Sequence, residues 1–301
     1  MVRRLLLLVL LVCAVGGAGF WVVSAAETQL PFALPQEPGD PTAGETVFHI
    51  SGCASCHAEK GAEGDERFKL AGGRAFETPF GTFHAPNVSM DPQTGIGAWT
   101  LEDFALAILN GVAPDGSHYY PAFPYASYAR MTGKDVADLW AFMRTLPAIE
   151  RANVAHELGF PFNVRRGLGL WKRLYLSRDQ IVEIGSSDEA IARGQYLVEG
   201  PGHCGECHTP RSAMGGLDPT RWLAGAPNPD GDGRIPNITP GEGGIGGWSQ
   251  ADIAEYLRSG FTPEFDTAGG SMVDVIRNTS QISDADRQAI ATYLKALPAV
   301  P

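Results

Sequence analysis

The sequence is poor in charge, and most of its charges are acidic. Only 19% of its 301 residues are charged, and 34 Asp and Glu against 23 Lys and Arg give a formal net charge of -11. Nucleic-acid binding needs a basic face for the phosphates, so this balance excludes nucleic acid as a partner. An acidic surface instead favours solubility and association with basic partners.

Long apolar runs are also missing, apart from Leu5 to Val23 behind Arg3 and Arg4. A membrane span needs about 20 apolar residues, whereas the core of a cleaved signal usually has about 7 to 15. We therefore expect residues 1–26 to be a signal anchor or a signal peptide. The run's length and its arginine pair favour the anchor, while Val23-Ser24-Ala25 would permit cleavage. Both alternatives predict that the rest of the chain is exported across a membrane.

No segment alternates convincingly between polar and apolar residues, so the sequence predicts no strand. The 37 glycines and 22 prolines predict ordered loops between short helices. Domains usually have about 100 to 200 residues, so the length favours two of them.

Cysteine is scarce, and four of the five form two copies of one pattern, Cys53-Ala-Ser-Cys56-His57 and Cys204-Gly-Glu-Cys207-His208. This spacing is typical of covalent haem attachment, because two thiols one helical turn apart can add to the two vinyl groups of one porphyrin. A thioredoxin-like redox pair or half of a zinc site would leave both histidines unexplained. We predict two haem c groups, held by these four cysteines, with His57 and His208 as axial iron ligands.

The rest of the sequence recurs at the same interval. Pro86-Asn87-Val88-Ser89 returns as Pro236-Asn237-Ile238-Thr239, at an offset of 150 residues. This repeat predicts two domains, 41–149 and 186–301, joined by a linker at 150–185. Helix N-caps are expected in equivalent places, at Thr100, Thr132, Ser249 and Ser283, each with Asp three residues later. Small residues, Gly44 and Gly194, would let the first and last helices of each repeat cross closely.

A helix, the haem motif, loops and a capped terminal helix resemble the class I cytochrome c fold, present twice and all-α. Gly81-Thr82-Phe83, His118-Tyr119-Tyr120-Pro121-Ala122 and Pro124-Tyr125-Ala126-Ser127-Tyr128 narrow the resemblance to membrane-bound cytochrome subunits of bacterial alcohol and gluconate dehydrogenases. Those subunits commonly carry three haems, so this chain resembles a shortened member.

The resemblance implies that Met272, 64 residues after His208, is the sixth iron ligand of the second haem. In the first repeat the family's ligand position holds Phe123, which cannot bind iron. The first iron could be open or water-bound, or it could be ligated by His118 or Met131; His84 and Met90 are also nearby in the sequence. His118 could equally hydrogen-bond a propionate or a loop carbonyl.

The segment from Arg151 to Gly185 is the only strongly basic stretch after the N-terminal run. We expect a connector with buried aromatic residues and with cations that are solvated or paired with propionates; a docking site would show the same composition.

Electron transfer is the leading functional hypothesis: a periplasmic dehydrogenase would supply electrons, and a quinone, an oxidase or another cytochrome would accept them. The rival is a di-haem peroxidase with an open first haem, for which no acid–base group is identifiable beyond His118. A gas-sensing module is a third hypothesis. No catalytic residue is predicted.

Overall fold

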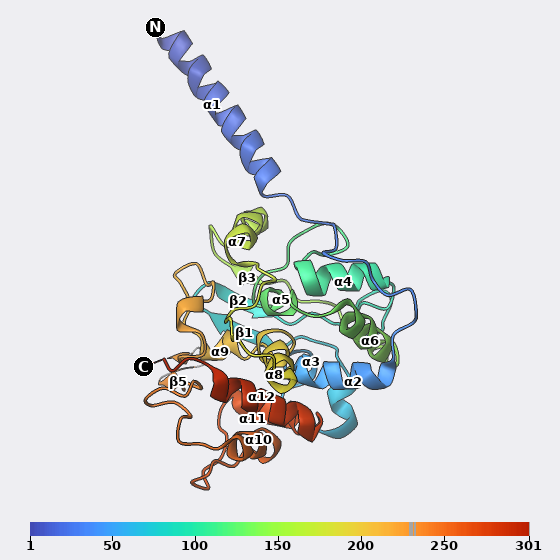
Figure 1. The fold of residues 1–301 in the computed structure, drawn as a ribbon. Coiled ribbons are helices and arrows are strands. Elements are labelled where there is room, and N and C mark those ends of the chain that lie inside the picture. The colour runs from blue at the N-terminus through green and yellow to red at the C-terminus, as the bar shows by residue number, and fades with distance from the viewer. Residues whose placement is uncertain (229–230, 232, 301) are drawn as a thin grey trace.

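A computed structural model describes residues 1–228, 231 and 233–300 of the chain. A long N-terminal helix projects away from a body built mostly of short helices (Figure 1). The helices are α1 (Val2–Val23), α2 (Pro41–Ile50), α3 (Cys53–His57), α4 (Leu101–Asn110), α5 (Tyr125–Tyr128), α6 (Gly133–Met143), α7 (Leu168–Tyr175), α8 (Glu189–Glu199), α9 (Gly205–His208), α10 (Gln250–Ser259), α11 (Met272–Thr279) and α12 (Asp284–Ala296). Three 3-10 turns lie at Gly64–Phe68, Arg165–Gly167 and Pro219–Arg221.

The prediction that the chain has no strand was wrong. A small antiparallel sheet has the order β1 (Ala75–Thr78), β2 (Gly81–His84) and β3 (Glu157–Leu158), and β4 (Ala226–Pro227) pairs with β5 (Arg234–Ile235). Strands of two to four residues are too short to show an alternating pattern. Their pairing is set instead by tight turns and by the linker, which supplies β3.

Helix starts were predicted correctly. Thr100 and Ser249 form capping boxes with Asp103 and Asp252, so each side chain satisfies a free backbone N–H at its helix start. The side chains of Thr132 and Ser283 accept hydrogen bonds in the same way at the starts of α6 and α12.

The close helix crossings are also confirmed. At Gly44, where α2 crosses α6, a Cβ atom would lie 1.9 Å from the Asp138 carbonyl oxygen. At Gly194, where α8 crosses α12, a Cβ atom would lie 2.0 Å from the Ala289 carbonyl oxygen. Both contacts are far inside van der Waals range, so each crossing requires glycine.

Buried apolar residues gather in two clusters. One contains Phe48, Leu109 and Leu139, all from the first repeat. The other contains Leu197 and Tyr293 from the second repeat, but it also takes Ile50 from the end of α2. A residue of the first repeat thus packs into the second core immediately before the first haem motif.

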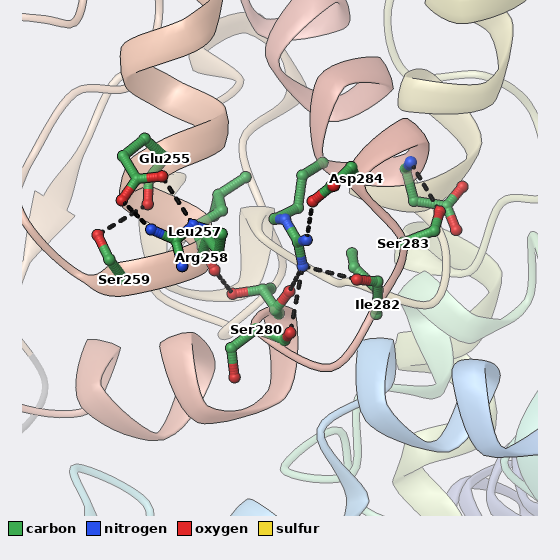
Figure 2. Close-up of polar contacts among 11 residues, drawn as sticks. Glu255, Leu257, Arg258, Ser259, Ser280, Ile282, Ser283 and Asp284 are labelled. Carbon is green, nitrogen blue, oxygen red and sulfur yellow. Dashed lines mark hydrogen bonds and ion pairs between the residues drawn. The ribbon is translucent and has the colours of Figure 1, made fainter.

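The Arg287 side chain on α12 forms hydrogen bonds with residues at and after the end of α11. Figure 2 shows those to Ser280, Ile282 and Asp284. Its Nη1 donates to the carbonyl oxygens of Thr279 at 2.7 Å and Ile282 at 2.6 Å. The side chain is buried, and it satisfies carbonyl groups that a helix end leaves unpaired. This anchorage fixes the helix whose first residue is Met272.

Candidate functional site

The two motif histidines make the same hydrogen bond. Nδ1 of His57 lies 2.8 Å from the Pro86 carbonyl oxygen, and Nδ1 of His208 lies 2.8 Å from the Pro236 carbonyl oxygen. A carbonyl can only accept, so Nδ1 carries the proton in both rings and the neutral Nε2 keeps a lone pair. Burial lowers the pKa of both histidines, and the carbonyl bond opposes this effect. A neutral imidazole with a fixed tautomer is what an iron ligand requires.

The motif cysteines lie on and beside the short helices α3 and α9. Cys53 and Cys204 are half-buried, whereas Cys56 and Cys207 are exposed. Burial raises the pKa of Cys53 and of Cys204 to about 12, which keeps both thiols protonated at neutral pH. In each motif one thiol is thus enclosed by protein and the other borders open surface, an arrangement that fits attachment to a flat group lying partly outside the helix.

Phe123 and Met272 lie at equivalent positions of the sequence repeat but in different local backbone, because Phe123 precedes α5 by two residues whereas Met272 is the first residue of α11. The isolated bridges Val112–His118 and Phe261–Thr267 recur at an offset of 149 residues, and the same offset relates Phe123 to Met272. Phe123 is partly buried against the first core, and Met272 is partly buried against the second. The recurring bridges thus agree with the alignment of the two repeats, and Met272 as the sixth ligand stays a prediction.

His118 is buried beside Ser24, the residue that ends the N-terminal helix. Its Nε2 donates to the Ser24 carbonyl oxygen at 2.9 Å, and its Nδ1 is buried without a hydrogen-bond partner. The contact matches one of the two structural roles expected for this residue, a bond to a loop carbonyl. It therefore weighs against His118 as the sixth iron ligand.

Met131, Met90 and His84 of the first repeat lie in three different surroundings. Met131 is 2% exposed within the first core. At an offset of 151 residues, the equivalent residue of the second repeat is the buried Ile282. A core role accounts for Met131 in full. Met90 packs partly buried against the same core, and His84 ends β2 with neither ring nitrogen hydrogen-bonded.

The two haem motifs lie against each other, which the sequence did not predict. The Ser51 carbonyl oxygen, two residues before Cys53, accepts from the Tyr128 hydroxyl at 2.7 Å and from Nε2 of His203 at 3.2 Å. His203 immediately precedes Cys204. The rings of Tyr128 and His203 also meet edge to face, with centroids 5.6 Å apart.

A second contact joins the first motif to α11 of the second repeat. The Asn278 side chain on α11 donates to Oγ of Ser55, between the first two cysteines, at 2.8 Å. The hydrogen bonds between the motif histidines and the proline carbonyl groups could have been predicted, because both residues recur in each repeat. The contacts between the repeats could not, because no sequence pattern marks them.

The linker departs from the expectation of buried aromatic residues. Trp171 is 8% exposed and its Nε1 donates to the Met214 carbonyl oxygen at 2.9 Å, as expected for a connector. Phe160 and Phe162, however, are 83% and 40% exposed. Phe160 is thus largely uncovered within the described part of the chain, whereas the Phe162 ring packs edge to face against Phe80, with centroids 4.9 Å apart.

Comparison with known proteins gives the motifs their context. Residues 41–147 match the family model of cytochrome c. The chain is 53% identical over 290 residues to the "Diheme cytochrome c-type" protein of Cereibacter sphaeroides, and the match covers 96% of each chain. The chain belongs to the di-haem c-type cytochromes. The prediction of two covalently bound haem c groups is thereby confirmed.

More distant relatives are subunits of dehydrogenases. The cytochrome is 38% identical over 268 residues to the cytochrome c subunit of alcohol dehydrogenase (quinone) from Gluconobacter oxydans, covering 86% of this chain and 55% of that one. It is 37% identical over 278 residues to the fructose dehydrogenase cytochrome subunit of Gluconobacter japonicus, covering 89% and 56%. The cytochrome spans little more than half the length of these subunits. The resemblance to dehydrogenase cytochromes is confirmed, and these relatives do not favour the peroxidase hypothesis.

Proposed function

We propose that this cytochrome carries electrons from a periplasmic dehydrogenase to a quinone, an oxidase or another cytochrome. The observation that carries the proposal is the direct contact of the two haem motifs through Ser51, Tyr128 and His203. A catalytic site needs an open centre and a poised acid–base group, whereas a carrier needs closely spaced redox centres. The packing of motif against motif serves the second purpose.

Each repeat would form one cytochrome domain with its own haem. Haem c supplies one-electron chemistry at iron. His57 and His208 would each bind iron through Nε2, because the Pro86 and Pro236 carbonyl oxygens hold Nδ1 protonated. Met272 would be the sixth ligand in the second domain, presented by a helix whose far end Arg287 fastens.

The first domain would lack a protein sixth ligand. Phe123 stands at the equivalent position, Nε2 of His118 is engaged by the Ser24 carbonyl oxygen, and Met131 is enclosed in the core. A thioether raises the potential of haem iron relative to an absent or weaker ligand. The two centres would thus differ in potential, which gives electron flow a direction.

The helix α1 would remain as a membrane anchor. Within the described residues it is the one helix long and apolar enough to cross a bilayer, although a signal sequence has the same properties. None of its residues is buried. An anchor would hold the carrier at the periplasmic membrane surface, where quinones and respiratory complexes are accessible.

The test is substrate-driven respiration in membranes of the native host after deletion of the gene. We expect oxygen uptake to be lost with one substrate among alcohols, fructose and gluconate, the substrates named by the relatives. Wild-type protein should restore it, whereas the double variant Cys204→Ala/Cys207→Ala should not. Unchanged oxygen uptake with every substrate, together with peroxide reduction by the purified protein, would favour the peroxidase instead.

A further inference from the structure

The end of α1 is held by two linker residues, Arg166 in the 3-10 turn before α7 and Arg173 on α7. Nε of Arg166 donates to Oγ of Ser24 at 3.0 Å, and its guanidinium lies 4.1 Å from the centre of a Trp21 ring. Nε of Arg173 donates to the Val23 carbonyl oxygen at 2.6 Å. Because these contacts are made with the last turn of α1 and its C-cap, the position of α7 relative to that helix is fixed (Figure 1).

Apolar side chains of the linker point away from the protein. Leu170 and Leu174, one turn apart on α7, are 39% and 73% exposed, although the adjacent Trp171 is buried. Phe160 and Phe162 in the preceding loop are exposed as well. We call these four residues, together with Arg173, the linker surface.

The charge of this segment is opposite to that of the chain. Residues 158–178 contain five Lys and Arg and no Asp or Glu, in a protein of net charge -11. Lys172 is buried against backbone carbonyl groups, but Arg165 and Arg173 are exposed. Exposed apolar residues with neighbouring cations are typical of segments that bind the interface of an anionic membrane.

The contacts with α1 set the depth of the linker surface. The apolar run of 19 residues is about 29 Å long as a helix, close to the hydrocarbon thickness of a bilayer. Trp21, in its last turn, would then lie at the interface, where tryptophan is enriched. Arg166 and α7 pack on this turn, so they lie at the level of the headgroups.

We propose that the linker surface lies on the membrane beside α1 and binds the headgroups of anionic phospholipids. The proposal rests on the proposed anchoring by α1. Leu170, Leu174, Phe160 and Phe162 enter the outer part of the bilayer, and Arg173 pairs with phosphates. The surface gives the body of the cytochrome one orientation relative to the membrane, which a single helix followed by a flexible tether would not.

The experiment uses the full-length, haem-loaded protein in nanodiscs of phosphatidylcholine with about 30% phosphatidylglycerol, a composition chosen to carry an anionic surface charge. Leu174→p-benzoylphenylalanine is photolysed and lipid adducts are measured by mass spectrometry. Phe265→p-benzoylphenylalanine is the matched control, because Phe265 is 88% exposed but lies between α10 and α11, at the end opposite α1 (Figure 1). Leu10→p-benzoylphenylalanine reports whether α1 is inserted.

We expect lipid adducts at positions 10 and 174 and none at 265, with a yield at 174 that falls at least about threefold in discs of phosphatidylcholine alone. Adducts at 10 without adducts at 174 would overturn the proposal while leaving the anchor intact. Adducts at 174 without adducts at 10 would refute the anchor and, with it, the position of the linker surface beside a membrane-spanning α1. Equal yields at 174 in both lipid compositions would refute the preference for anionic headgroups.

Discussion

The two repeats share a backbone plan and differ at one functional position. Both hold the motif histidine on a proline carbonyl and cross their outer helices at a glycine. The first continues into the four-residue α5 with Phe123 ahead of it, whereas the second presents Met272 on the eight-residue α11. The two repeats therefore keep the same hydrogen bond to the motif histidine and the same helix crossing, although the residue at the predicted sixth-ligand position differs.

Removing one attachment site is expected to have the largest effect. Cys53→Ala/Cys56→Ala should leave one haem per chain, and that haem should keep the spectrum of the second centre, because each repeat has its own buried cluster. Protein mass and haem content of the purified variant check this. Cys204→Ala/Cys207→Ala is the mirror control, and loss of both haems from either variant would show that the repeats do not fold independently.

Replacing the predicted thioether should change the second centre strongly. Met272→Ala should lower its potential by a substantial part of the roughly 0.8 V range that axial ligands span, and should open the iron to carbon monoxide. Redox titration followed by visible spectra measures both effects. Met214→Ala is the control, because Met214 is 58% exposed in the same repeat; an equal effect of that variant would refute Met272 as the ligand.

Restoring a thioether to the first repeat should make the two centres more alike. Phe123→Met places a sulfur at the position equivalent to Met272, so the first potential should rise and carbon monoxide binding should fall. Phe123→Leu, which changes packing without adding sulfur, controls for disturbance of the partly buried site. If both variants behave identically, position 123 does not control ligation.

The anchorage of α11 should matter for stability. Arg287→Ala leaves the carbonyl groups of Thr279 and Ile282 without their buried donor, so we expect a loss of about 3 kcal/mol in unfolding free energy. The measurement is chemical denaturation followed by the absorbance of the second haem. Arg258→Ala is the matched control, since Arg258 pairs with Glu255 on the exposed face of α10 and its loss should lower the unfolding free energy much less than the loss of Arg287. Similar losses of unfolding free energy in both variants would show that the hydrogen bonds of Arg287 do not stabilise the end of α11.

A smaller effect, which depends on pH, is expected from the buried Lys172 at the C-terminal end of α4. Nζ of Lys172 donates to the carbonyl oxygens of Asn110 and Gly111, each at 2.7 Å, and burial lowers the pKa of Lys172 to about 7. The unfolded lysine keeps its proton to about pH 10, so native stability should rise with pH above 7, by about 1 kcal/mol between pH 7 and 8. Denaturation midpoints at both pH values measure this. Lys172→Met should lack the increase, and an unchanged slope would refute the assignment.

Much of this architecture could be predicted from the sequence because it depends on local signals. N-caps such as Thr100 and Ser249 act within one helical turn, and the helix-crossing glycines recur with the repeat. The short strands were missed because their pairing depends on turns and on β3, which is about 75 residues from its partner. The contact of Ser51 with His203 was missed for a similar reason, since it joins positions 152 residues apart through a backbone carbonyl.

Local pattern also misjudged the linker. Trp171 and Phe160 belong to one aromatic, basic segment, yet the first is buried and the second exposed. Nothing in the residue types separates them, because the difference arises from which side of α7 and of its preceding loop packs on the body. The candidate sixth ligands of the first repeat could be narrowed only by geometry too, because the Ser24 carbonyl oxygen that occupies Nε2 of His118 lies 94 residues away in the sequence.

The asymmetry of the two haem centres is tested most directly by anaerobic redox titration of the wild-type protein with and without carbon monoxide. The account predicts two separate potentials, with carbon monoxide binding half of the haem and shifting only the lower potential, because Met272 as the proposed ligand would block the second iron and Phe123 could not block the first. A single potential for both haems and no binding of carbon monoxide would contradict it.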